Sequence, residues 1–449
     1  MQAEGAFVQQ IAEFERPGAF VAPDGVPQAN AAECCPARRP DRFSVELVSA
    51  ADLADLTEGW RDLVQRADVP NVFMHPLLLR AAAAGAERVT AVLAWGVFGR
   101  ERRLLGIWAF SAGRARQSML PLRFLSAPAA EHAYLGSPAI DRDHLDETLA
   151  AMLDAIVAAP DLPNLIAVNA MRAEGATYDA LLRVLTQRGS PPCHFESVQR
   201  PRLASECDAE SYWQAALSSS SRKKLRQFRR RLGEKGTLQT RVLSEPAEVQ
   251  SAFEQFLTLE SQGWKGQRGT ALASRPEDAE FARNMINRLA RTGEASMHVL
   301  ELDGRPVSMQ VVLHAGPAAY TWKTAYDEAL GAFSPGMLLL EDYTKAFLAD
   351  PAIRFVDSCA HDDSGYMAAW QERQTMADVW FEARPGVSVQ FTAAARLERA
   401  YRAARQRTKQ IYLASPMLQR LQDTAATFRR MGGKREEKSA REQASVEAA

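Results

Sequence analysis

The sequence has almost no net charge and few cysteines, and each shortage excludes a class of protein. Its 54 Lys and Arg residues offset 55 Asp and Glu residues, which leaves a net charge of -1. This balance argues against bulk electrostatic attraction to nucleic acid or membrane as the main activity. The five cysteines are odd in number and form no CxxC pair, so neither a disulfide framework nor a zinc site is indicated. We expect reduced thiols, no bound metal and a cytoplasmic location.

Several segments and motifs of known function are also missing. No run approaches the ~18 apolar residues that a membrane span needs. The N-terminus lacks a basic stretch followed by an apolar core, so we expect a protein without a transmembrane segment. The sequence contains no GxSxG elbow, HExxH metal helix, GxGxxG fingerprint, P-loop or kinase motif set, which disfavours those reaction classes.

The composition that remains is that of a globular protein, with 47% hydrophobic and 24% charged residues in a chain of 449. Hydrophobic periodicity predicts alternating helices and strands that occur twice in the same order. Asp303-Gly304 lies between β-rich runs and predicts a hairpin. We predict five segments: a disordered arm over 1–41, an α/β domain over 42–200, a second copy over 201–390, a helical segment over 391–431 and a disordered tail over 432–449.

Residues 321–340 combine a predicted strand, a short loop and the start of an apolar helix. Ser334 suits an N-cap, Pro335 suits the first helical position, and Gly336 allows backbone N–H groups to approach a ligand closely. A strand that leads into an exposed helix N-terminus can bind an anion, such as the pyrophosphate of an acyl carrier. A well-capped structural helix is the other interpretation of the same pattern.

The most basic segment is residues 222–231, within a predicted helix over 209–233. Leu225, Phe228 and Leu232 fall on one helical face, which leaves a cationic outer side. That side is either a solvated face or a contact for the phosphates of a nucleotide-bearing carrier, an RNA, or an acidic lipid or polymer. Aromatic residues for base stacking are nearly absent from it, which disfavours RNA.

Candidate chemistry also lies in the strands of the second half. The predicted strand 318–326 contains Lys323, and a lysine in a central strand is costly unless it is paired or functional. Strict alternation places Lys323 on the face opposite Trp322. Asp357 and His361 follow the next apolar strand, at the edge where open α/β sheets bind ligands, and either could accept a proton from an attacking amine.

A glycine-punctuated loop over 260–272 supplies further polar groups. It holds Trp264, Lys265 and Arg268 together, and its three glycines permit tight turns. An exposed loop that combines an aromatic ring with cations is a candidate part of a binding pocket.

Taken together, these motifs resemble the GNAT-like acetyltransferase domain of CelD-type proteins. CelD-type proteins are bacterial, are linked to cellulose or other exopolysaccharide biosynthesis, and are relatives of the FemAB aminoacyl transferases. The match covers about 210–385. The motifs that carry it are Trp264-Lys265-Gly266, Lys323-Thr324-Ala325-Tyr326-Asp327-Glu328, Phe333-Ser334-Pro335-Gly336, Asp357-Ser358-Cys359-Ala360 and Trp370-Gln371-Glu372-Arg373.

The resemblance implies tandem GNAT-like domains and transfer of an acyl group from acetyl-CoA or another acyl-CoA to an amine or hydroxyl. In such folds a helix N-terminus after a central strand holds the carrier's pyrophosphate, a role that falls here on Ser334, Gly336, Met337 and Leu338. The usual Gln/Arg-x-x-Gly-x-Gly/Ala run is missing before the helix, which leaves aminoacyl-tRNA or another carrier open.

From the sequence we therefore predict a GNAT-type acyltransferase whose second half contains the site. The predicted catalytic residues are Asp357, His361, Lys323, Tyr326 and Asp327, and the predicted carrier-binding residues are Ser334, Gly336, Met337, Leu338, Trp264, Lys265 and Arg268. The acceptor is a small amine or a glycan. Two alternatives stay open: an aminoacyl-tRNA-dependent transferase, and a binding module without catalysis in a polysaccharide synthesis assembly. The oligomeric state is left open.

Overall fold

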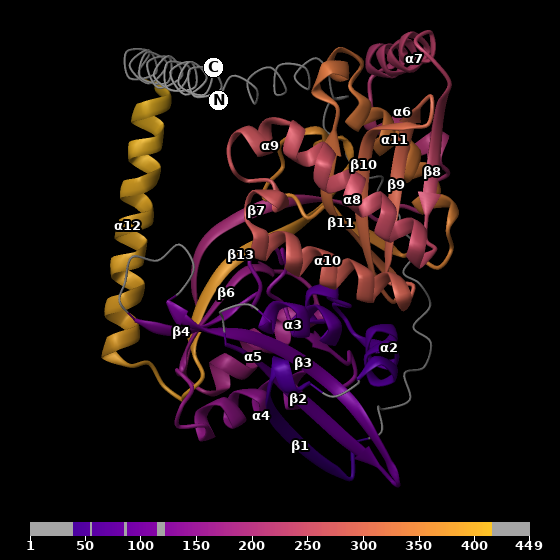
Figure 1. Ribbon diagram of the computed structural model, residues 1–449. Coiled ribbons are helices and arrows are strands. Elements are labelled where there is room, and N and C mark those ends of the chain that lie inside the picture. Colours follow the sequence, from indigo (N-terminus) through magenta and orange to yellow (C-terminus); the bar gives the residue numbers. More distant parts are fainter. Residues whose placement is uncertain (1–38, 54–55, 85–87, 115–121, 415–449) are drawn as a thin grey trace, which may run out of the picture. The chain divides into compact units, whose positions relative to one another are not determined.

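The computed structural model describes residues 39–53, 56–84, 88–114 and 122–414 (Figure 1). The chain divides into a compact unit that ends at Val387 and a second unit that begins at Ser388. The described part of the second unit contains the helix α12 (Val389–Ala414). Residues 1–38 of the predicted arm, the predicted tail and residues 415–431 of the predicted helical segment lie outside the described residues.

One mixed, twisted sheet runs through the first unit. Its strands follow the order β1-β2-β3-β4-β6-β13-β7-β12-β11-β10-β9-β8, with β5 paired to β3. The strands are β1 (Arg42–Ser49), β2 (Val89–Phe98), β3 (Glu101–Arg114), β4 (Arg123–Ala127), β5 (Ala139–Ile140), β6 (Leu165–Arg172), β7 (Cys193–Leu203), β8 (Leu238–Leu243), β9 (Ala295–Leu302), β10 (Arg305–Ala315), β11 (Ala318–Tyr326), β12 (Phe355–Asp357) and β13 (Glu372–Glu382). Most pairs of neighbours are antiparallel, whereas β4–β6 and β11–β12 are parallel.

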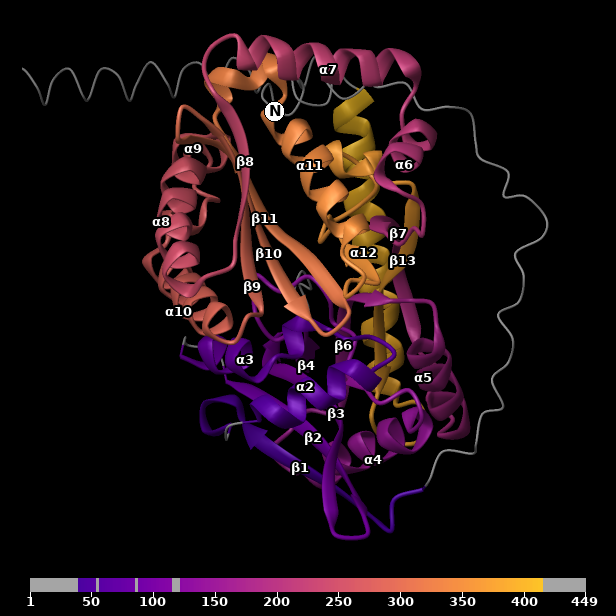
Figure 2. The ribbon, with the colours of Figure 1, turned by 90° about the vertical axis from the view of Figure 1, so that its right-hand side faces the viewer.

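Helices flank this sheet on both sides, which confirms the predicted fold class. They are α2 (Thr57–Arg66), α3 (Pro76–Ala83), α4 (Leu145–Ala158), α5 (Ala176–Gln187), α6 (Ala209–Ala216), α7 (Ser219–Gly233), α8 (Pro246–Gln262), α9 (Trp264–Gln267), α10 (Pro276–Arg291) and α11 (Pro335–Ala349). In the second half, α8 and α10 cover one side of β9, β10 and β11, and α11 covers the other (Figure 2).

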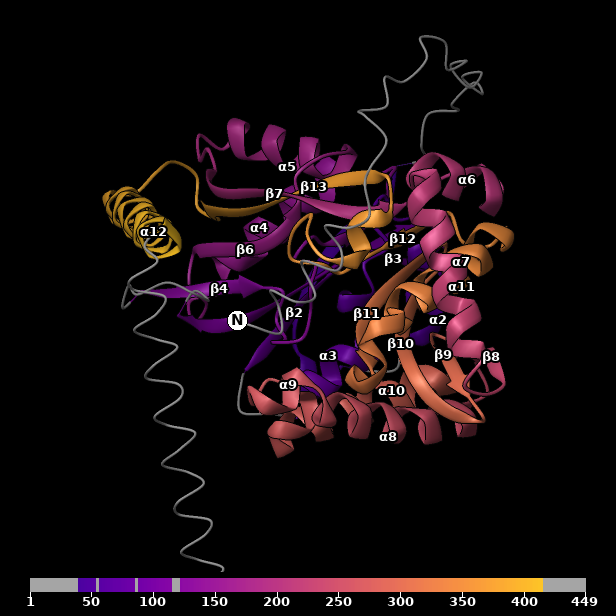
Figure 3. The ribbon, with the colours of Figure 1, turned by 90° about the horizontal axis from the view of Figure 1, so that it is seen from above.

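The last strand of the sheet joins the two halves of the chain. β13 pairs antiparallel with β6 along one edge and with β7 along the other, as the view from above also shows (Figure 3). The boundary predicted near residue 200 falls within β7, and the whole span to Val387 forms one compact unit. The division into two copies stays a prediction.

The structure corrects three local predictions and confirms another. Asp303 and Gly304 both adopt positive φ, at 53° and 75°, and form the predicted hairpin turn between β9 and β10. The helix predicted over 209–233 is two helices, because Ser218 accepts a hydrogen bond from Ser221 N at 3.2 Å and caps the second one. The loop predicted over 260–272 contains the short helix α9.

The third correction concerns Ser334. It precedes α11 in the left-handed region, with φ 47° and ψ 57°, and its side chain makes no capping hydrogen bond. Pro335 does occupy the first helical turn. The residue type therefore predicted the position of the helix start and not the way it is capped.

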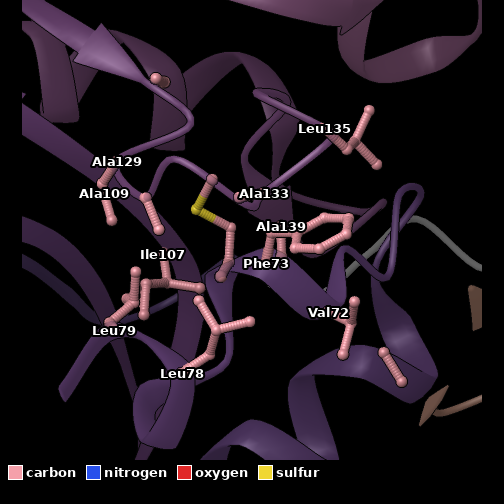
Figure 4. Close-up of a cluster of buried hydrophobic side chains, with 14 of the residues drawn as sticks. Val72, Phe73, Leu78, Leu79, Ile107, Ala109, Ala129, Ala133, Leu135 and Ala139 are labelled. Atoms are coloured by element: carbon pink, nitrogen blue, oxygen red, sulfur yellow. The ribbon is translucent and has the colours of Figure 1, made fainter. Parts of the chain in front are cut away.

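A buried apolar cluster in the first half holds the loop that follows β4 (Figure 4). The cluster joins Phe73 and Leu79 to Ile107 of β3, and it includes Ala133 and Leu135 from the loop that follows β4. Close packing of this kind leaves side chains few alternative positions. The residue between Ala133 and Leu135 is Tyr134, so the loop holds its backbone firmly.

Candidate functional site

The parallel strands β11 and β12 diverge soon after they begin. They pair at Ala318–Phe355, Ala319–Val356 and Tyr320–Asp357. Beyond that point β11 continues to Tyr326, whereas β12 ends. Among the described residues, no strand pairs with this side of β11 past Tyr320. This side of the β11 backbone therefore lacks a strand partner from the point where β12 ends, which makes it a candidate place for a ligand.

Asp357 lies at the point of divergence and is fully buried. Its Oδ2 accepts a hydrogen bond from Gln374 Nε2 at 2.6 Å and lies 3.5 Å from Arg200 Nη1. Its Oδ1 accepts one from Cys359 N at 2.7 Å. Both carboxylate oxygens are thus occupied by donors of the protein, and the carboxylate holds the turn after β12 against β7 and β13.

Lys323 faces away from α11, beside the loop that carries Tyr134. A β-bulge at Val311/Val312 of β10 leaves Trp322 without a partner in the register, and a bulge places two successive side chains on one side of a sheet. Accordingly, Trp322 Nε1 donates to His132 O at 2.8 Å, and Lys323 Nζ lies 5.5 Å from the Trp322 ring. The predicted placement of Trp322 and Lys323 on opposite faces is wrong for this reason.

Tyr134 brings a side chain of the first half into the site. Its ring centroid is 5.7 Å from Lys323 Nζ and 5.8 Å from the His361 ring, which meets it edge-on. Arg200 Nη1 donates to Tyr134 O at 2.8 Å and so ties the same residue to Asp357. The structure thereby brings together Lys323, His361 and Asp357, three of the residues predicted as catalytic.

Burial and neighbouring cations set the charge states in this cluster. Burial lowers the pKa of His361, and the charges of Arg200 and Lys323 lower it further. His361 is therefore neutral near pH 7 and can accept a proton. Burial also lowers the pKa of Lys323 and raises the pKa of Tyr134, so the Tyr134 phenol stays protonated and can donate a hydrogen bond.

The glycine-punctuated loop supports β11 from the α8 side. Lys265 Nζ lies 2.9 Å from Glu260 Oε1 and donates to Thr324 O at 2.9 Å, which links α8 to the strand. Trp264 N donates to Glu328 Oε1 at 2.5 Å, and Arg268 lies 4.9 Å over the Trp264 ring. Lys265 thus has a supporting contact with β11, whereas Trp264 and Arg268 lie further out on the loop.

The connection from β11 to α11 holds the remaining predicted residues. Asp327 caps a 3-10 turn by accepting from Ala329 N at 3.0 Å, and its other oxygen accepts from Arg305 Nη2 at 2.6 Å. Burial, with the charge of Glu328, raises the pKa of Tyr326 to about 12, so its hydroxyl keeps its proton. Both residues lie on the strand and turn that lead to α11.

The first turn of α11 offers fewer free donors than predicted. Met337 N and Leu338 N both donate to Ser334 O, at 2.9 and 3.1 Å. Pro335 has no N–H. Gly336 N is therefore the donor of this turn for which the described residues provide no acceptor, and a Cβ at Gly336 would meet the nearest atom, Tyr326 Cδ1, at 3.9 Å. The first turn is buried from Pro335 to Leu338, so the prediction of an exposed helix N-terminus is wrong.

The inner side of α7 packs beside the same turn. Arg229 Nη2 donates to Leu338 O at 3.2 Å and pairs with Asp342 Oδ1 at 2.6 Å. On the outer side, Lys223, Arg226 and Arg231 are exposed. The described residues provide no ion-pair partner within 4.0 Å for these three cations.

Sequence reasoning missed Tyr134, Arg200, Gln374 and Glu260. Tyr134 and Arg200 belong to the first half, and nothing in their local pattern indicates contact with residues more than a hundred positions away. A weak signal existed for Glu260, because an acidic residue near the end of a helix and five positions before a lysine can form an ion pair. Gln374 carried no such signal.

One part of the second half matches a described family model. Residues 219–366 match the family model described as an acetyltransferase (GNAT) domain. No curated protein matches the chain. Among solved structures, FemX is similar over 74% of this chain and 96% of its own, with 12% identity and a TM-score of 0.50.

Two further solved structures are similar at lower scores. The C-terminal domain (DUF2156) of a putative lysylphosphatidylglycerol synthetase from Agrobacterium fabrum has 14% identity and a TM-score of 0.45, over 77% of this chain and 94% of its own. A tandem GNAT protein from the clavulanic acid biosynthesis pathway has 13% identity and a TM-score of 0.40, over 77% and 100%.

Residues 219–366 thus match the model of a GNAT acetyltransferase domain, and the chain shares its fold with FemX. The site described above, from Lys323 to His361, lies inside the matched range. Among the described residues, no helix has both the length and the apolar character required to cross a membrane.

Proposed function

We propose that the protein is an acyltransferase that moves an acyl group, acetyl in the first instance, from acyl-CoA to an amine or hydroxyl. The observation that carries this proposal is the divergence of β11 and β12 inside the matched GNAT domain, with Lys323, His361 and Tyr134 around it. The resemblance to CelD-type proteins further suggests an acceptor in exopolysaccharide or cell-envelope biosynthesis.

The proposed path of the carrier follows the open side of β11. The acyl-bearing arm lies along the strand, where backbone groups past Tyr320 have no strand partner. The pyrophosphate lies at the start of α11, near Gly336 N and the positive end of the helix dipole. This path brings the thioester to the level of Lys323 and His361.

The proposed chemistry is direct attack of the acceptor on the thioester. The acceptor's nitrogen or oxygen forms a bond to the carbonyl carbon, backbone N–H groups polarise the carbonyl oxygen, and the C–S bond breaks. His361 takes the proton of the nucleophile. In this scheme Asp357 is a positioning residue, because its oxygens already accept three donors, and it holds the turn from which His361 projects.

Carrier binding tests the proposal directly. In a thermal-shift assay with CoA and acyl-CoAs, a carrier at about a hundred times its Kd stabilises the native state by roughly 2.7 kcal/mol. The proposal requires such a shift with at least one acyl-CoA. If no acyl-CoA changes the melting temperature, the acyltransferase proposal fails, and the binding module without catalysis becomes the better interpretation.

Substitution of Gly336 by alanine should weaken acyl-CoA binding without lowering stability. An added Cβ has 3.9 Å to its nearest neighbour within the chain, so the fold tolerates it, but the methyl group stands beside the free N–H where the pyrophosphate is proposed. Steric crowding of about 1–3 kcal/mol predicts roughly a 5- to 150-fold rise in Kd, measured by calorimetry. Gly331→Ala is the matched control, because nothing lies within 4 Å of a Cβ there. Equal affinities of the two variants would contradict the proposed pyrophosphate position.

An aminoacyl-tRNA-dependent transferase is the second candidate, and the outer side of α7 favours it. Replacing Lys223, Arg226 and Arg231 together by glutamine should flatten the salt dependence of RNA binding. Each lost phosphate contact lowers the slope of log K against log salt by about 0.7 to 0.9, so the triple variant should lose roughly two units. Filter binding over a salt series measures it. An unchanged slope, or no tRNA binding by the parent protein, rules out this surface as an RNA contact.

A further inference from the structure

The ammonium group of Lys323 has no counter-ion in contact with it. Among the described residues, none provides an oxygen within hydrogen-bonding or ion-pair distance of Lys323 Nζ, and its neighbours are the rings of Tyr134 and Trp322 at 5.7 and 5.5 Å. Aromatic faces stabilise a cation only in part. A half-buried ammonium without a partner is unfavourable, so an anion beside it would be stabilising.

Two other donors near Lys323 also lack acceptors. The phenol of Tyr134 makes no hydrogen bond to a described residue, and the Nε of Arg200 is buried without a partner. Arg200 reaches the same place, because its Nη1 donates to the carbonyl oxygen of Tyr134. We call Lys323, Tyr134 and Arg200 the donor cluster. Arg200 Nε is the buried member of the donor cluster, whereas Lys323 and Tyr134 are partly exposed. Donors without acceptors in one place can bind an acceptor from a ligand.

The ion pairs around the donor cluster leave one positive charge uncompensated. Asp357 offsets Arg200 at 3.5 Å, and Glu260 offsets Lys265 at 2.9 Å. Lys323 remains. Glu260, Asp278 and Glu131 act on Lys323 only from a distance. Glu260 is paired with Lys265, and Asp278 and Glu131 both pair with Arg275 at 2.7 Å. A ligand with one negative charge would neutralise the uncompensated charge of Lys323.

We propose that the donor cluster binds the carboxylate of the acceptor, so that the acceptor is an amino acid or a sugar acid. This inference rests on the proposed acyl transfer and specifies its substrate class. A carboxylate supplies one charge and two acceptor oxygens, which suits Lys323 and the Tyr134 hydroxyl together. A phosphate dianion brings more charge than Lys323 can offset.

The position of His361 fits the same arrangement. Its ring meets the Tyr134 ring edge-on at 5.8 Å. A carboxylate held by Lys323 and Tyr134 therefore places the neighbouring amine or hydroxyl of the acceptor close to His361. The donors that would bind the carboxylate are therefore close to His361, which would accept the proton. A small substrate whose nucleophile is near its carboxylate requires this arrangement.

Chemical labelling of lysines tests carboxylate binding by the donor cluster without measuring acyl transfer. The full chain is treated with formaldehyde and borane, and methylation of each lysine is followed by peptide mass spectrometry. The probes are N,N-dimethylglycine and methyl glucuronoside, each compared with its neutral amide. At about three times its Kd, a bound carboxylate slows methylation of Lys323 about fourfold. Lys345 is the internal control, because it is exposed and paired with Glu341 on α11, and its rate should not change.

The results separate the possible outcomes. Protection of Lys323 by either carboxylate but not by its amide supports the proposal, and the probe that protects identifies an amino acid or a sugar acid. Tyr134→Phe should then raise the Kd of the protecting carboxylate about tenfold, because a hydrogen bond to a charged group is lost. At the same probe concentration, protection should fall from about fourfold to about 1.3-fold. Equal effects of carboxylate and amide, no protection by any probe, or no methylation of Lys323 in the free chain would overturn it.

Carrier binding, measured on the same sample, separates this inference from the proposed function. If acetyl-CoA binds but no carboxylate protects Lys323, the acyltransferase proposal stands and the proposal that the donor cluster binds a carboxylate is wrong. If a carboxylate protects Lys323 but no carrier binds, the donor cluster does bind a carboxylate and the acyltransferase proposal is wrong.

Discussion

Replacing Asp357 by alanine is expected to destabilise the native state by about 3–5 kcal/mol, the usual cost of leaving one partner of a buried ion pair without the other. The change removes the acceptor of Gln374 Nε2 and Cys359 N and leaves Arg200 without the carboxylate that it contacts among the described residues. Urea unfolding, with a check that the slope stays constant, measures the loss.

An exposed ion pair provides the matched control for that experiment. Asp146 pairs with Arg183 at 2.6 Å, and both side chains are about half exposed, at 42% and 53%. Asp146→Ala should cost less than about 1 kcal/mol. If Asp357→Ala proves as harmless as Asp146→Ala but abolishes activity, Asp357 is a catalytic residue and not a positioning residue, contrary to the scheme above.

Replacing His361 by alanine should lower kcat of acyl transfer about 10²- to 10⁴-fold, the range that a positioned general base contributes. The fold should be little affected, because His361 is accessible to solvent although neighbouring groups partly desolvate its imidazole. Added imidazole should restore part of the activity, since it can accept the same proton. A variant that keeps full activity, or one that imidazole does not rescue although it is folded, would show that another group takes the proton.

The pH dependence of the parent enzyme tests the same role. Burial and the cations Arg200 and Lys323 lower the pKa of His361 below its ordinary value of 6.5. The neutral, proton-accepting form therefore dominates at neutral pH. We expect kcat/KM to stay level from pH 8 to near 6.5 and to fall only at lower pH, as His361 becomes protonated. In His361→Ala this acid limb should disappear.

Local patterns predicted the elements of the second half well, since turn chemistry and periodicity are local properties. Asp303-Gly304 predicted a hairpin because few other residues adopt two successive positive φ angles. Pro335 marked the start of α11 because its missing N–H costs nothing in a first turn. The fold class followed from the same alternation of strands and helices.

The site could be predicted only in part, because it depends on contacts between distant residues. Lys323 and His361 stood out as polar residues at a strand and a strand end, and the structure brings both to one place. Their environment was not predictable. The bulge opposite Val311 that turns Trp322 towards Lys323 leaves no mark in the sequence, and Tyr134 reaches them from a loop of the first half.

The place of β13 in the sheet has a consequence for synthesis of the chain on the ribosome. Its neighbours β6 and β7 are complete at residue 203, but β13 itself ends at Glu382. At about 5–20 residues per second, the nascent chain spends on the order of ten to thirty seconds with two facing strand edges unpaired. Exposed edges of this kind are templates for wrong pairing. Chaperone demand during translation should therefore peak in this interval and end when β13 emerges.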